Sequence, residues 1–92
     1  PFGPANKQPV FYSNNLKDTG YCKTVGEEDK HLKLSLRQDN SDTFKAIAFG
    51  LGDKLSLVKN KAQFKAAFNI DENNWNGVKS VQLKLLDIKS ND

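Results

Sequence analysis

Cysteine and histidine are scarce in this sequence, which holds one of each in 92 residues, Cys22 and His31. A lone cysteine forms no disulfide within the chain, and these two residues are too few for a structural zinc site. The sequence offers no second imidazole for a proton relay and no histidine at a recognisable spacing from Cys22 for thiolate catalysis. We therefore expect no catalytic residue, no metal ligand and no cofactor in this part of the protein.

Long apolar runs are also missing. No stretch approaches the roughly 18 apolar residues that span a membrane. The first residues, Pro1 to Pro4, lack both a methionine and the basic-then-apolar order of a signal peptide. We expect a fragment of a longer chain with no membrane partner. Because a single unpaired cysteine suits a reducing compartment, we expect that compartment to be the cytoplasm.

Charge of one sign is only slightly in excess. Fourteen Lys and Arg residues against 11 Asp and Glu residues give a net charge of +3, and the pI is near 9.1. These values suit a nucleic-acid partner, but they suit solubility alone as well. The acidic residues cluster in predicted turns, at 27–29, 39–42 and 71–72, rather than in the pattern of a two-metal nuclease site. With 37% hydrophobic and 27% charged residues, a chain of this length predicts one globular domain.

Prolines mark the first segment of the chain. All three prolines fall within residues 1–9 and favour a linker, so we place the folded domain at 10–89 and a short tail at 90–92. Within the domain, His31 to Arg37 alternates polar and apolar residues without a fault, which predicts a strand with its leucines inside and its other side chains in water. Similar patterns predict a long, bent first strand over 10–25 and further strands over 43–49, 64–70 and 81–88.

A short helix is predicted between the third and fourth strands. Leu51, Leu55 and Val58 recur at helical spacing, and Asp53 is placed to cap a helix over 54–59. Loops are predicted at 39–42 and 71–77, the second ending in an Asn-Gly hairpin signal. Three strands, one helix and two strands predict an all-β, five-stranded Greek-key barrel of the oligonucleotide-binding (OB) type. An SH3-like barrel lacks a helix at that point, whereas an open α+β sheet stays an alternative because periodicity does not reveal strand order.

Cations on the second predicted strand are the first candidate binding groups, because a single strand of nucleic acid needs positive charge along its phosphates. Lys33 and Arg37 lie four residues apart on one face, about 13 Å at roughly 3.3 Å per residue, which spans two adjacent nucleotides. Lys45 and Lys84 extend the patch if their side chains share that face. The alternative is a solvated sheet face whose charges serve solubility.

Rings that could stack on unpaired bases are the second group of candidates. Trp75 lies in the predicted loop 71–77, and Phe49 lies beside glycines at a strand end. Each has a structural alternative, Trp75 as a packing anchor over a barrel end and Phe49 as a cover for the helix. His31, beside Lys33 on the wet face, is a candidate for a hydrogen bond to phosphate or for stacking on a base.

Several blocks of the sequence resemble one known family. They are residues 1–6, 9–11, 25–26, 31–34 (His-Leu-Lys-Leu), 46–50, 73–77 (Asn-Asn-Trp-Asn-Gly), 81–83 and 87–88. In this order, covering nearly the whole chain, they are similar to the OB domain of the RecJ single-strand-specific exonucleases. Ala5-Asn6-Lys7 departs from the Gly-Asn-Pro that the family usually has there.

The resemblance implies a non-catalytic module downstream of a nuclease core with an Asp-His-His motif and manganese or magnesium. Neither the motif nor the core lies in this sequence. Such a module would grip single-stranded DNA as it feeds towards the nuclease core of the same parent chain, a 5′–3′ exonuclease of DNA repair and recombination. Lys33 and the wet face of its strand are the matching positions.

Two other functions stay open at this point. One is a structural barrel that docks the nuclease core or another protein without touching DNA. The other is an enzyme in its own right, which requires metal-dependent nuclease activity from these 92 residues.

Overall fold

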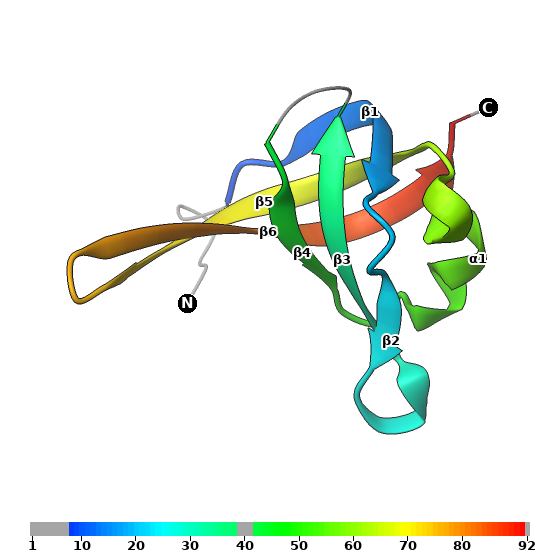
Figure 1. The fold of residues 1–92 in the computed structure, drawn as a ribbon, viewed down its shortest axis with the longest axis horizontal. Helices are drawn as coiled ribbons and strands as arrows, with labels where there is room; N and C mark the ends of the chain where they lie inside the picture. Colours follow the sequence, from blue (N-terminus) through cyan, green and yellow to red (C-terminus); the bar gives the residue numbers. More distant parts are fainter. Residues whose placement is uncertain (1–7, 39–41, 92) are drawn as a thin grey trace.

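A computed structural model describes residues 8–38 and 42–91 of the chain (Figure 1). In chain order its elements are β1 (Phe11–Asp18), β2 (Lys23–Val25), the 3-10 turn η1 (Glu27–Asp29), β3 (His31–Gln38), β4 (Phe44–Ala48), the 3-10 turn η2 (Gly52–Lys54), α1 (Leu55–Val58), the 3-10 turn η3 (Lys59–Lys61), β5 (Phe64–Trp75) and β6 (Val78–Ser90). Residues 1–7 of the predicted linker, 39–41 of the predicted loop and 92 of the predicted tail lie outside the described residues.

The strands close into a barrel. β1 pairs with both β5 and β3, β5 pairs with β6, β6 runs parallel to β4, and β4 pairs with β3, so the ring returns to its start. β2 continues the path of β1 along β3, so β1 and β2 together form the long, bent first strand of the predicted barrel. The five-stranded OB-fold barrel is confirmed, and the open sheet and the SH3-like barrel are excluded.

The bend between β1 and β2 is held by one buried carboxylate. Asp18, only 1% exposed, accepts hydrogen bonds at Oδ2 from the backbone N–H groups of Gly20, Tyr21 and Cys22, at 2.7, 2.6 and 2.8 Å. Its Oδ1 accepts a fourth from the N–H of Ser35, at 2.8 Å. A buried carboxylate is tolerated only when its lone pairs are satisfied, and here the donors come from the bend and from β3. The carboxylate therefore fastens the bend to β3.

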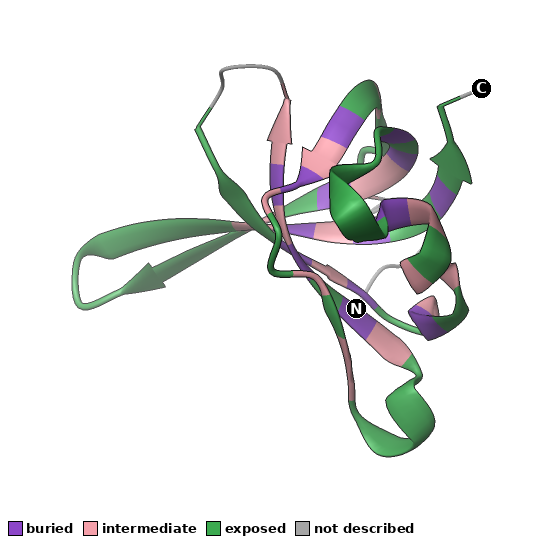
Figure 2. Cartoon of the chain, turned by 45° about the vertical axis from the view of Figure 1, so that its right-hand side comes forward, coloured by how far each residue is buried: buried purple, intermediate pink, exposed green. Residues whose placement is uncertain are grey.

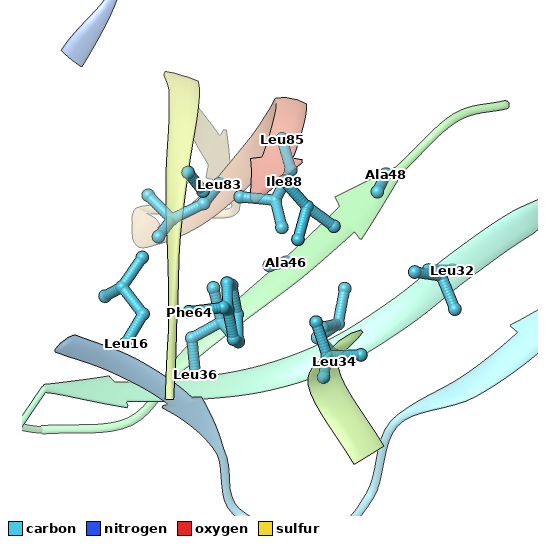
Figure 3. Close-up of a cluster of buried hydrophobic side chains, with 12 residues drawn as sticks. Leu16, Leu32, Leu34, Leu36, Ala46, Ala48, Phe64, Leu83, Leu85 and Ile88 are labelled. Carbon is cyan, nitrogen blue, oxygen red and sulfur yellow. The ribbon is translucent and has the colours of Figure 1, made fainter. Parts of the chain in front are cut away.

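The core fills the barrel (Figure 3), and three of its side chains are alternate residues of β3. Leu32, Leu34 and Leu36 are 0%, 4% and 1% exposed, which confirms the predicted inward face. On β4, Ala46 and Ala48 are the buried pair. The remaining core side chains are Leu16, Val58, Phe64, Ala66, Leu83, Leu85 and Ile88.

The helical segment is shorter than predicted and is not capped by Asp53. α1 spans four residues between two 3-10 turns, Asp53 lies inside η2, and no side chain caps the helix. Its position depends instead on a close backbone approach. The Gly52 N–H donates to the Lys30 carbonyl at 2.7 Å, and a Cβ on Gly52 would overlap the Asp29 carbonyl oxygen. Only glycine fits there, so η2 packs directly on the turn before β3.

The prediction of a polar loop over 71–77 is wrong. β5 and β6 stay paired beyond the barrel as far as Trp75 and Val78, forming an arm that projects from the rest of the molecule (Figure 1). Only Asn76 and Gly77 form the turn, with φ angles of 49° and 78°, as in a two-residue hairpin of the primed type. The arm is exposed on both faces (Figure 2), so its polar composition reflects exposure to solvent rather than absence of a strand.

Replacing Asp18 with asparagine is expected to lower the free energy of unfolding by about 2–4 kcal/mol. Either orientation of the amide sets an NH₂ group against backbone N–H donors, and the charge that strengthens the remaining bonds is lost. Urea unfolding followed by circular dichroism measures the change. Asp53→Asn, at an exposed carboxylate, is the matched control and should stay within about 0.5 kcal/mol of the parent. Equal stability of Asp18→Asn and the control would contradict the role assigned to this carboxylate.

Candidate nucleic-acid interface

The outer face of β3 carries a row of side chains that crosses four strands. Lys33 lies directly opposite Lys23 on β2 and opposite Ile47 on β4, and Ile47 lies opposite Lys84 on β6. Directly paired residues project from the same side of a sheet. The sequence predicted that Lys33 and Lys84 could share a patch, and the register places them on one face with Ile47 between them.

A second set of pairs lies further along β3. Ser35 is opposite Lys45, and Lys45 is opposite Gln82 on β6, which places Lys45 on the same outer face. Arg37 is opposite Lys17 on β1.

Arg37 is less exposed to solvent than the sequence predicted. It shares the outer side of β3 with Lys33, but it is half-buried at the end of the barrel. Its Nε atom is buried and has no hydrogen-bond partner within residues 8–38 and 42–91. Its backbone position is as predicted, and its guanidinium is less available to a ligand than the ammonium of Lys33.

These pairs concentrate positive charge without neutralising it. Lys23 faces Lys33, and Lys17 faces Arg37. Within the described part of the chain, the only ion pairs join Lys30 to Glu28, at 3.9 Å, and Lys79 to Glu72, at 3.5 Å. Like charges placed directly opposite each other destabilise a sheet, and an anion bound between them would offset that cost. We name the outer-face residues Lys17, Lys23, Lys33, Arg37, Lys45, Ile47, Gln82 and Lys84 the cationic face.

His31, Phe49 and Lys84 form a cluster at the edge of the cationic face. The rings of His31 and Phe49 meet edge to face with centroids 5.3 Å apart, and Lys84 Nζ lies 5.9 Å from the Phe49 ring centre. The Gly50 N–H donates to His31 Nδ1 at 2.8 Å, so a neutral His31 carries its proton on Nε2. Phe49 is 55% exposed. The cluster thus offers a ring, an ammonium and an imidazole N–H side by side.

Trp75 is not part of this cluster. It ends β5 at the tip of the arm, paired with Val78, and is 77% exposed, so it neither lines a barrel mouth nor anchors packing. Because side chains alternate between the two sides of a strand, and six positions separate Val78 from Lys84, Trp75 and its partner Val78 lie on the same side of the ladder as Lys84. Lys84 lies six positions after Val78 on β6, which is about 20 Å along a strand. The structure therefore leaves Trp75 at a distance from the other six predicted residues. Those six lie on the cationic face or at its edge, namely His31, Lys33, Arg37, Lys45, Phe49 and Lys84.

Four residues of the cationic face were not predicted, namely Lys17, Lys23, Ile47 and Gln82. Lys17 and Lys23 flank the bend, where the sequence shows no clear alternation. Their partners depend on strand register, and register is not readable from one strand alone.

Cys22 has the chemistry of a structural thiol. Burial, then the negative charge of Asp18 and a hydrogen bond to it, raise the pKa of the Cys22 thiol above its ordinary value. The thiolate is the nucleophilic form, so this environment disfavours reactivity. Among the described residues, no group of three or more His, Cys, Asp or Glu side chains is placed to hold a metal ion. No helix in residues 8–38 and 42–91 is long and apolar enough to cross a membrane.

The closed barrel is that of the OB-fold proteins. Comparison with known families identifies one family within this fold. The family model described as the RecJ OB domain matches residues 1–87, so the chain belongs to this family. The crystal structure of RecJ from Thermus thermophilus, in complex with Mg²⁺, shares the fold with a TM-score of 0.61 at 23% identity. The match covers 100% of this chain and 13% of that one. No curated protein matches the chain.

Alkylation of Cys22 by iodoacetamide should be slow at pH 8 and should accelerate only above the pH at which an ordinary thiol ionises. The raised pKa keeps the thiol protonated in the folded chain. The same chain unfolded in guanidinium is the control, because unfolding removes both the burial and the Asp18 charge. Mass spectrometry over a pH series gives the two rate profiles. Coinciding midpoints, or a lower midpoint in the folded chain, would contradict the raised pKa.

Proposed function

We propose that this chain is a non-catalytic module that binds single-stranded DNA within a RecJ-like 5′–3′ exonuclease of DNA repair and recombination. The observation that carries the proposal is the cluster of His31, Phe49 and Lys84 beside the cation pair of Lys23 and Lys33. A base can stack on the exposed Phe49 ring while the lysines contact the adjoining phosphates, which is how single strands are bound without sequence readout.

The path of the strand follows from the same face. Phosphates would lie over Lys33, Lys45 and Lys84, while Ile47 between them offers an apolar contact for a sugar or base. The face sits on strands β3 and β4, equivalent to strands 2 and 3 of an OB barrel when β1 and β2 are counted as strand 1, and these strands commonly carry the ligands of this fold. On this path, Trp75 would meet a base further along, where the arm extends.

The activity of the whole protein is part of the proposal. The chain spans 13% of the length of the Thermus RecJ chain that it matches. We propose that the remainder of the parent supplies the nuclease core with its manganese or magnesium, and that the module acts beside it in the cytoplasm.

A docking role without DNA contact is favoured by a different feature. An apolar groove of about 270 Å³ opens where the arm leaves the barrel, and Phe44, Phe68, Ile70 and Val81 are among its lining residues. Three of these side chains are about 40% exposed, namely Phe44, Ile70 and Val81. Packing against the nuclease core or another protein would remove this surface from water. Such docking need not exclude DNA from the cationic face.

Reversing two charges of the cationic face tests the proposal. Lys33→Glu with Lys84→Glu should weaken binding of labelled oligothymidylate at least tenfold and make the slope of log affinity against log salt shallower by about 1.4, for two lost phosphate contacts. Lys59→Glu with Lys61→Glu makes the same charge change on η3 and is the matched control. Unchanged binding by the first variant, or an equal loss in the control, would contradict DNA binding by the cationic face. The docking role would then remain.

Stacking on Trp75 has its own readout, because the chain has a single tryptophan. Saturation with an oligothymidylate long enough to reach the arm should quench its fluorescence, while a duplex of equal length should quench it much less. Trp75→Leu should weaken single-strand binding by about 1–3 kcal/mol without lowering stability, because the side chain is 77% exposed. Unaltered fluorescence at saturation, with binding followed separately by anisotropy of the labelled strand, would remove Trp75 from the interface.

A further inference from the structure

A hollow of about 480 Å³ lies on the outer side of β1, β5 and β6, away from the cationic face. The strands β5 and β6, which carry most of the hollow's other lining residues beside those of β1, pass behind β3 and β4 in Figure 1. The floor of the hollow is low because the outward-facing Ala67 is small. Register shifts interrupt both neighbouring ladders, between Ser13 and Leu16 on β1 and between Ala67 and Phe68 on β5. Bulges of this kind often re-aim side chains beside functional sites.

Two lysines lie side by side at the hollow. Lys65 on β5 is directly opposite Lys89 on β6, and neither makes an ion pair within the described residues. This is a third cross-strand pair of like charges in the barrel, and it destabilises the ladder unless an anion lies between the two ammonium groups. Both lysines line the hollow, so an anion bound in it would meet both.

The other walls provide a ring and an acceptor. Tyr12 is directly opposite Ala67, and Ala67 is directly opposite Asp87, which sets the three side by side. The Tyr12 side chain is 80% exposed, with only a methyl group beside it on β5. Asp87 Oδ1 accepts a hydrogen bond from the Ile88 N–H at 2.9 Å, and a carboxylate oxygen can accept two, so both Oδ1 and Oδ2 have capacity for a ligand donor. The hollow therefore combines two cations, an aromatic face and a carboxylate.

We propose that this hollow is a second nucleotide site, with Lys65 and Lys89 holding the phosphate and Tyr12 stacking on the base. Asp87 would repel a bare phosphate ion but would accept hydrogen bonds from a base that presents N–H donors. Guanine presents two adjacent donors, N1–H and the 2-amino group, which match the two oxygens of a carboxylate, whereas thymine presents one. The site therefore selects guanine nucleotides over thymine nucleotides. This inference does not depend on the proposed function, because the two surfaces share no residue.

Titration of the 92-residue chain with 2′-deoxyguanosine 5′-monophosphate, followed by amide NMR shifts, tests the site. The amides of Tyr12, Ala67 and Lys89 should move, and thymidine 5′-monophosphate should bind about tenfold more weakly. Lys65→Glu should abolish these shifts while raising the melting temperature, because an opposite-charge pair replaces two like charges; this separates loss of binding from loss of folding. Asp87→Asn should remove the preference between the two nucleotides.

Lys33→Glu should leave the shifts of the Tyr12, Ala67 and Lys89 amides unchanged, so the failure of one surface is distinguishable from the failure of the other. Shifts absent from the three amides, or an affinity unchanged by Lys65→Glu, would overturn the second site. Equal affinity of the parent chain for the two nucleotides would overturn the role of Asp87. If the parent chain does not bind oligothymidylate, the proposed function is contradicted and the second site is not.

Discussion

The carboxylate of Asp18 and its four backbone donors are the constraint on which the barrel depends. The chain leaves the β1 ladder at Asp18 and rejoins β3 only at Lys23. Between them, the Thr19 N–H still donates to the Ser35 carbonyl of β3 at 2.9 Å, whereas the next three N–H groups donate to Asp18. The carboxylate supplies acceptors for these three N–H groups and for one of β3, where unpaired donors would carry a desolvation penalty. With the bend held, β1 can pair with β5 on one side and β3 on the other, and the ring closes.

The same bend sets the electrostatics of the outer surface. Lys17 comes just before Asp18 and Lys23 just after the bend, and each is placed opposite a cation of β3. A barrel that was selected for stability alone would gain by opposing these residues with carboxylates. Apart from Asp18, Asp42 and Asp87, the acidic side chains of the described residues lie instead in the turn η1, along the arm and in the helical segment. On the proposed function, an anionic partner would offset the cost of the unneutralised pairs, and an unpaired polynucleotide would supply both the charges and the rings that Phe49 can stack on.

The sequence predicted those parts of the fold that depend on local pattern. The alternation from His31 to Arg37 placed three leucines inside correctly, and the element order predicted the barrel. The arm was missed because polarity was taken to indicate a loop, whereas a two-stranded ladder exposed on both faces is also polar. Lys17 and Lys23 were missed because register depends on the whole barrel. The role of Asp18 was missed because nothing nearby in the sequence distinguishes a buried carboxylate from one in a turn.

The most direct test of the central claim, that the cationic face binds an unpaired strand through its phosphates, is the affinity of the chain for oligothymidylate at a series of salt concentrations. A duplex of equal length should be measured beside it. Contacts with about three phosphates predict a slope near −2 for log affinity against log salt, with the duplex bound more weakly at each concentration. An affinity that does not change with salt, or a duplex bound as tightly as the single strand, would contradict the account.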